Sequence, residues 1–136
     1  MASNTARAIV RWRHQLVFDG NGPGRPPITI DGNSAAGTSP VELLLVACAC
    51  CTGADIVGIL EKVRVRLDTL DIEVVGTRRE DHPRRFTAIQ FRLSVRGAGA
   101  DETKVRRAVE LSLEKYCSVM ASLAPDIRVD CDVAIA

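Results

Sequence analysis

Five cysteines are the residues of this sequence whose types and spacing could carry chemistry. Three of them, Cys48, Cys50 and Cys51, share one apolar segment, whereas Cys117 and Cys131 lie in separate segments nearer the end of the chain. A free thiol can fill a core, bind a metal as its thiolate, or take part in redox reactions. An odd number of cysteines in a chain of this length argues against a disulfide-stapled secreted scaffold.

A metal site is the weaker of the two chemical interpretations. Tetrahedral zinc needs ligands that converge on one point, usually from a turn. On a helix only Cys48 and Cys51, three residues apart, would share a face, and His14 and His82 both lie on other segments. We therefore expect neither a metal site nor any organic cofactor.

The alternative is a redox pair formed by Cys51 and Cys117. Cys117 stands on or beside the apolar stripe predicted for a second helix, so packing of that stripe against the first helix would bring it toward Cys51. Disulfide formation requires Cα atoms about 4.4–6.8 Å apart, which only tertiary packing can supply here. The pattern permits this pair and equally permits two buried, inert thiols. We interpret Cys131, on the apolar face of the last predicted strand, as core filler.

Length and composition predict one globular domain spanning residues 1–136, with 46% hydrophobic and 26% charged residues. The net charge is only +1, and the basic residues are scattered without interleaved aromatic residues, so we expect no nucleic-acid partner. No signal peptide is apparent at the start, and the uncharged apolar run Leu43–Ala54 is too short to span a bilayer. These features predict a cytoplasmic protein with no membrane partner.

The elements that must position the cysteines can be read from periodicity and capping signals. Ser39, Pro40 and Glu42 form a helix start with a capping box, and the helix should run to about Lys62. Because it carries no charge from Leu43 to Ala54, it should be buried on all sides, by a sheet, by other helices or by a second subunit.

Alternating apolar residues predict strands on both sides of this helix. We expect a second long helix capped by Asp101 and ended by Pro125. Its inward stripe would be Val105, Ala108, Val109, Ser112, Leu113, Tyr116 and Met120. The predicted class is α+β, with helices packed on a mostly antiparallel sheet. The strands are expected over residues 8–18, 26–30, 63–74, 86–96 and 127–135, with a turn over 19–24.

Two segments resemble the signatures of the OsmC/Ohr family, and the resemblance covers essentially the whole chain. In residues 39–51 a small polar residue and a proline open an alanine- and leucine-rich helix, as in that family, and the reactive cysteine falls on Cys51. Residues 114–119 resemble the late helix that carries the partner cysteine, here Cys117. The chain is most similar to a less-studied branch of the family.

The resemblance implies an OsmC-like fold in an intertwined homodimer, with active sites at the subunit interface and each long helix buried against the partner's sheet. It also implies a peroxidase acting on organic hydroperoxides. Cys51 would be oxidised to a sulfenic acid, and Cys117 would condense with it to a disulfide. A dithiol reductant would reset the pair; in better-studied branches this is a dihydrolipoyl group on a carrier protein.

The family also supplies an arginine that stabilises the reactive thiolate, held by a glutamate that follows the helix-opening proline. Arg25 matches that arginine best by position, with Arg11 and Arg13 as rivals. The glutamate position is occupied by Val41, which predicts slower peroxidase turnover or a different substrate.

Two nearby carboxylates, Glu42 and Asp55, are candidates to replace that glutamate. We interpret Glu42 as part of the capping box, and Asp55, one turn beyond Cys51, as an anchor for the arginine or merely a solvated residue. The departure at Val41 keeps open a non-catalytic alternative, in which the fold binds a small apolar ligand in the dimer cleft or senses oxidants. An apolar pocket lined by Leu44, Leu45 or Val46 would instead favour organic peroxides.

Overall fold

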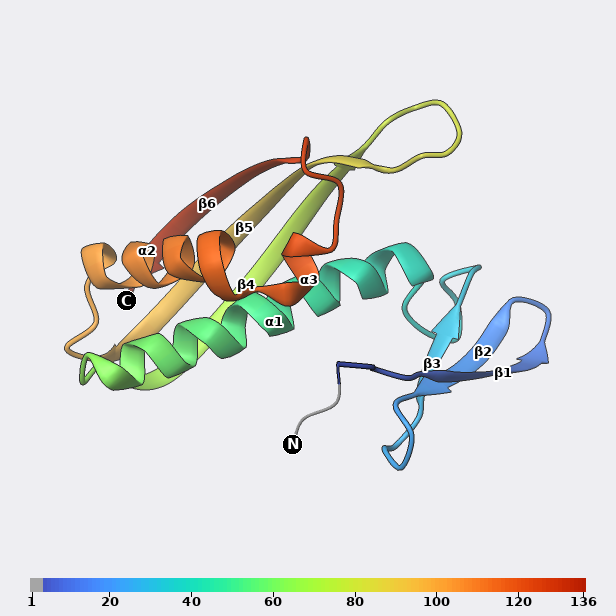
Figure 1. Ribbon diagram of the computed structural model, residues 1–136, viewed down its shortest axis with the longest axis horizontal. Helices are drawn as coiled ribbons and strands as arrows, with labels where there is room; N and C mark the ends of the chain where they lie inside the picture. Colours follow the sequence, from blue (N-terminus) through green and yellow to red (C-terminus); the bar gives the residue numbers. More distant parts are fainter. Residues whose placement is uncertain (1–3) are drawn as a thin grey trace. The chain divides into compact units, whose positions relative to one another are not determined.

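The computed structural model describes residues 4–136, in which the chain forms two compact units, one ending at Leu44 and the other running from Leu45 to Ala136. Helices and two three-stranded sheets alternate along the chain, which confirms the predicted α+β class (Figure 1). The elements in order are β1 (Ile9–His14), β2 (Val17–Asn21), β3 (Ile28–Asp31), α1 (Pro40–Lys62), β4 (Arg66–Arg78), β5 (Phe86–Ala98), α2 (Glu102–Leu111), the π-helical turn η1 (Ser112–Tyr116), α3 (Ser118–Ala121) and β6 (Arg128–Ile135).

The N-terminal unit is an antiparallel meander in the order β1-β2-β3. The single strand predicted over residues 8–18 is wrong, because the chain reverses at Gln15, whose φ of 47° is typical of a tight turn. The predicted half-buried face is also largely exposed, and 66% of Trp12 is accessible within this chain. The alternation of apolar residues continued across the turn and therefore concealed it.

Asp31, at the end of β3, organises the loop that leads to α1. It is only 3% exposed, and its carboxylate accepts hydrogen bonds from the backbone N–H groups of Asn33 (2.8 Å), Ala35 (3.2 Å) and Ala36 (2.9 Å). The hydrogen bonds from Ala36 and Asn33 are the main causes that lower the pKa of Asp31 below its ordinary value. The ionised carboxylate therefore holds this loop together.

We expect the stability that Asp31 provides to disappear in acid. Its folded-state pKa lies below the unfolded value of about 3.9, so the contribution is complete above about pH 4 and is lost as the pH falls through the folded pKa. The free energy of unfolding of the wild type and of Asp31→Asn should be measured between neutral pH and strong acid. The gap between them should be constant above about pH 4 and close below it; a gap that is independent of pH would contradict this role.

Helix α1 begins and ends where the sequence predicts. The Ser39 Oγ accepts the Glu42 N–H at 3.1 Å, and the Glu42 carboxylate accepts the Ser39 N–H at 3.0 Å, which confirms the capping box. By length and composition the complete helix could cross a membrane, although its uncharged run Leu43–Ala54 is too short to do so alone. The core helix of a soluble protein has the same features.

The C-terminal unit contains the sheet β4-β5-β6, in which β5 pairs antiparallel with β4 and parallel with β6. Helices α1 and α2 lie over one face of this sheet (Figure 1). The alternation predicted for β5 is confirmed, since its apolar face is buried while the intervening polar residues lie on the opposite face. The buried set is Phe86, Ile89, Phe91, Leu93 and Val95.

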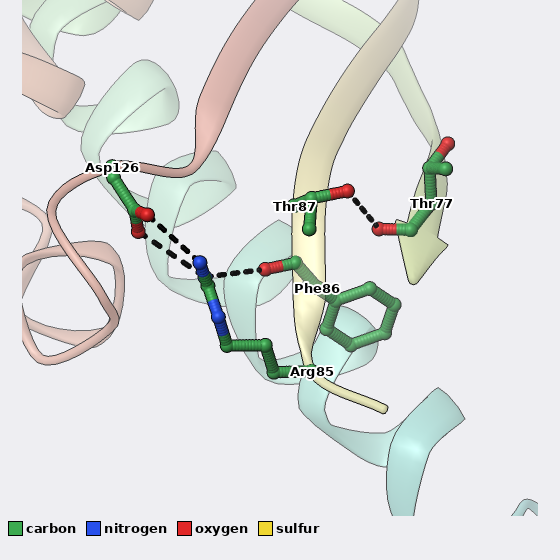
Figure 2. A network of polar contacts seen from close by, with 5 residues as sticks. All are labelled: Thr77, Arg85, Phe86, Thr87 and Asp126. Atoms are coloured by element: carbon green, nitrogen blue, oxygen red, sulfur yellow. Dashed lines mark hydrogen bonds and ion pairs between the residues drawn. The ribbon is translucent and has the colours of Figure 1, made fainter. Parts of the chain in front are cut away.

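The start of β5 is tied to both of its neighbours (Figure 2). Arg85 makes a bidentate ion pair with Asp126, at 3.1 and 2.8 Å, and this pair joins the start of β5 to the loop before β6. Arg85 also donates a hydrogen bond to the Phe86 carbonyl. The Phe86 ring lies directly over Gly76 of β4, where an added Cβ would come within 2.3 Å of the ring. Gly76 is therefore required by close packing.

Gly76→Ala should destabilise the protein by about 1–3 kcal/mol, because the ring of Phe86 has to move out of a well-packed position. Chemical denaturation measures this loss. Gly20→Ala is the matched strand control, since its nearest contact would be an ordinary 3.5 Å to Ile30. Equal stabilities for the two variants would refute the packing argument.

The second helical segment starts as predicted, with Asp101 capping the N–H of Lys104 at 2.8 Å, but it is not one continuous α-helix. After α2 the chain widens into the π-helical turn η1, in which the Cys117 N–H donates to the Ser112 carbonyl five residues earlier. The extra residue shifts the inward face by one position. Tyr116, predicted to point inward, is 56% exposed, whereas Cys117 is buried.

Candidate active site

The C-terminal unit brings the thiols of Cys51 and Cys117 close to each other. Cys51 lies halfway along α1 and is half-buried, while Cys117 occupies the extended junction between η1 and α3 and is 3% exposed. The side chain of Cys51 is near enough to that of Cys117 to contribute to the raised pKa of Cys117. Both thiols are free, so the arrangement is that of a reduced dithiol.

Two donors converge on the sulfur of Cys117. The Thr52 hydroxyl donates to Cys117 Sγ at 3.5 Å, and the backbone N–H of Met120 donates to it at 3.4 Å. Thr52 itself is completely buried in α1. Donors placed in this way stabilise negative charge on the sulfur, whether it develops as Cys117 attacks another atom or as it leaves a disulfide.

Burial nevertheless dominates the acidity of the two inner thiols. It is the largest cause that raises the pKa of Cys117 above its ordinary value, and the charge of Cys51 adds to it, while the bonds from Thr52 and Met120 act against it. Burial also raises the pKa of Cys48, with further contributions from the charges of Cys117 and Cys51. No positively charged residue among those described contributes to either shift.

Cys48 is thus a third member of the cluster, although sequence analysis gave it no role. It is 0% exposed and lies one turn before Cys51 and Thr52 on the same side of α1. Cys50 is exposed on another side of α1, and Cys131 is half-buried in β6, where burial raises its pKa. Within residues 4–136 no three side chains of the metal-binding types gather into a site that could hold an ion.

Asp55 has a partner that the sequence did not indicate. The hydroxyl of Ser112, completely buried in η1, donates to its carboxylate at 2.8 Å. Asp55 therefore links α1 to the π-helical turn that positions Cys117. Within residues 45–136 no arginine forms an ion pair with it, so the predicted arginine anchor stays a prediction.

The predicted arginines lie in the N-terminal unit. Arg25 is exposed in the loop between β2 and β3, where its N–H donates to the Gly22 carbonyl at 3.0 Å. Arg13 of β1 forms an ion pair with Asp19 at 3.5 Å, and Arg11 is exposed on the same strand. The role of Arg25 beside Cys51 stays a prediction.

Thr52 and Ser112 are the polar residues of this site that sequence reasoning missed. A hydroxyl in the middle of an all-apolar buried helix is a usable signal, because buried polar groups almost always have a hydrogen-bond partner. Thr52 met that criterion next to Cys51. Ser112 was placed on an inward stripe, but its partner depends on the π-helical turn, which periodicity does not reveal.

Comparison with known proteins places this architecture in a family. A family model described as OsmC-like protein matches residues 31–132, and the chain belongs to this OsmC-like family. It is 37% identical to the protein YhfA of Escherichia coli over 124 residues, covering 90% of this chain and 92% of the relative. The resemblance found in the two cysteine-bearing segments is thereby confirmed.

Solved structures show the same fold. An OsmC-like protein from Mycoplasma pneumoniae superimposes with a TM-score of 0.84, at 15% identity, over 99% of each chain. The organic hydroperoxide resistance protein OhrB of Bacillus subtilis gives a TM-score of 0.60 at 19% identity, over 97% of this chain and 98% of its own. At these identities the likeness establishes the fold alone.

Proposed function

We propose that this protein is a thiol-dependent peroxidase that reduces organic hydroperoxides through Cys51 and Cys117. The observation that carries the proposal is that a partly accessible thiol, Cys51, lies close to a buried thiol, Cys117, although the two come from segments far apart in the sequence. Family membership and the fold shared with a protein named for organic hydroperoxide resistance support a redox role.

The reaction follows from the exposure of the two sulfur atoms. Peroxide reaches Cys51, whose thiolate attacks one peroxide oxygen; the O–O bond breaks, Cys51 becomes a sulfenic acid, and the alkoxide leaves as the alcohol after protonation. Cys117 then attacks the Cys51 sulfur, a disulfide forms, and water leaves. The two donors on Cys117 stabilise its charge during this attack. An external dithiol, for example a dihydrolipoyl carrier protein, returns both cysteines to thiols.

A cation has to stabilise the Cys51 thiolate, because this cysteine lies well beyond the first turn of α1, where the helix dipole acts. We assign this role to Arg25, with Arg11 and Arg13 as alternatives. Val41 stands where the family has the glutamate that holds the arginine, which supports slower turnover than in the better-studied branches.

The active form is proposed to be a homodimer. Several apolar side chains of α1 are exposed in the single chain, including Leu44 (37%), Val46 (48%) and Val57 (46%). A helix that is apolar all round needs cover on this side as well, and a second copy of the chain supplies it. We place the protein in the cytoplasm, where thiols are kept reduced.

Anaerobic titration of the reduced protein with cumene hydroperoxide and with hydrogen peroxide tests the proposal. Free thiols should be counted and any disulfide mapped by mass spectrometry. The expected result is rapid loss of two thiols per chain to a Cys51–Cys117 disulfide, faster with the organic peroxide. Slow oxidation spread over all five cysteines would refute it.

A non-catalytic binding role is the second candidate, because one observation favours it. A hollow of about 410 Å³ opens between α1 and the segment α2–η1, with a largely apolar lining and Asp55 and Lys62 at its polar side. No cysteine lines it; the other lining residues are Gly58, Ile59, Val63, Leu111 and Tyr116. Binding of an apolar fluorescent probe that survives Cys51→Ser and is lost in Gly58→Trp would favour this role.

A further inference from the structure

Cys48 has no part in a two-cysteine cycle, yet it lies in the same cluster. Its side chain is completely buried, as is that of Thr52, which donates to Cys117 Sγ. Cys48, Cys51 and Thr52 occupy positions i, i+3 and i+4 of α1, which are neighbours on a helix surface. Cys117 lies against the Thr52 corner of this triangle, since the Thr52 hydroxyl donates to its sulfur at 3.5 Å, and it is near enough to Cys48 and Cys51 for their charges to affect one another.

We propose that Cys48 is a second disulfide partner of Cys117, so that the bond formed on oxidation moves from Cys51–Cys117 to Cys48–Cys117. The inference rests on the proposed function only for the origin of the first disulfide. In this exchange the Cys48 thiolate attacks Cys117 Sγ, the new S–S bond forms, and Cys51 leaves as the thiolate. The proton given up by Cys48 is available to Cys51, and no net oxidation or reduction takes place.

The end state of this exchange suits the burial of its sulfur atoms. A thiolate is disfavoured in the interior, which is why the pKa values of Cys48 and Cys117 are raised. A disulfide carries no charge and loses nothing by burial there. After the exchange the neutral bond joins the two buried sulfur atoms, while the free thiol is the half-buried Cys51, which water can reach.

The position of Cys117 allows either partner. It is the junction residue between η1 and α3, with extended backbone angles (φ −75°, ψ 99°), and is not held inside a regular helix. A movement of this junction by up to one helical turn along α1 would take Cys117 from one corner of the triangle to the other, since neighbouring Cβ atoms at i and i+3 are about 5–6 Å apart.

The consequence is an enzyme that stores one oxidising equivalent and restores its reactive thiol. Once the bond has moved, Cys51 is free and a second peroxide molecule can oxidise it to the sulfenic acid before any reductant arrives. The wild type should therefore consume up to twice as much peroxide per chain, without reductant, as Cys48→Ser.

Disulfide mapping over time tests the exchange directly. The reduced protein is oxidised anaerobically with one equivalent of cumene hydroperoxide or, in a parallel sample, of diamide, then quenched with acid at intervals and alkylated. The expected result is a Cys51–Cys117 bond at early times, replaced by Cys48–Cys117 at a rate independent of protein concentration, with Cys51 becoming alkylated. A Cys51–Cys117 bond that persists with Cys48 still a free thiol overturns the inference.

The two oxidants separate this inference from the proposed function. If diamide gives the migrating disulfide and the peroxide gives none, the peroxidase assignment fails and the exchange stands. Cys48→Ser should hold the bond at Cys51–Cys117, whereas Cys50→Ser, which changes an exposed cysteine of the same helix, should exchange like the wild type. Loss of exchange in both variants alike would count against a specific role for Cys48.

Discussion

Cys51→Ser is expected to abolish peroxide consumption, with a fall in rate on the order of 10³-fold or more, because a hydroxyl cannot replace the thiolate as nucleophile. Serine is nearly isosteric, and Cys51 is only half-buried, so the fold and the dimer should persist. Peroxide consumption is measured under excess dithiol, and the oligomeric state by sedimentation. Full activity in this variant would end the assignment of Cys51 as the reactive cysteine.

Two further variants sharpen the result. Cys50→Ser, at the exposed neighbouring position, should retain wild-type turnover and so controls for non-specific loss of a thiol. Cys117→Ser should consume about one equivalent of peroxide and then stop, leaving a sulfenic acid on Cys51 that dimedone traps. A Cys117→Ser variant that still turns over through the same route would show that Cys117 is not the resolving cysteine.

Val46→Glu should weaken the proposed homodimer by about 10²–10³-fold in its dissociation constant, because an unpaired carboxylate would be buried on association at a cost of several kcal/mol. In a single chain the same change should be tolerated, since Val46 is 48% exposed and lies with Val57 and Cys50 within about 40° around the helix axis. Sedimentation equilibrium over a range of concentrations measures the effect.

Ser94→Glu is the matched control for this prediction. It adds the same charge to the exposed polar face of β5, between Arg92 and Arg96, and should leave the dissociation constant unchanged. If Val46→Glu and the wild type associate equally well, the exposed face of α1 is not the subunit interface. If the wild type is monomeric at all concentrations, the homodimer itself is refuted.

Local sequence signals predicted the elements that depend on local chemistry. The capping box at Ser39 and Glu42 located the start of α1, and the alternation from Phe86 onward located β5 and its buried face. The same kind of signal failed at Gln15, because a tight turn can preserve the alternation of apolar residues while reversing the chain.

The candidate site was predictable only in part, for a physical reason. The resemblance in two short segments singled out Cys51 and Cys117, but no periodic pattern reports that Thr52 reaches Cys117 or that Ser112 reaches Asp55. Both contacts join residues more than fifty positions apart, and they depend on how η1 packs against α1. Tertiary packing, rather than residue type, selects these partners.

The number of residues in the π-helical turn η1 determines whether Cys117 faces Cys51. One additional residue in a helical turn rotates everything that follows by about 100°, which exchanges the orientations of two adjacent side chains. Straightening the turn into a regular α-helix of the same length would direct Tyr116 inward and carry Cys117 away from Cys51, whereas deleting one residue, for example Glu114, would place Cys117 four residues after Ser112 and keep it on the inward face. An insertion of one residue here would thus turn Cys117 off the inward face and abolish the dithiol while leaving all five cysteines in the sequence.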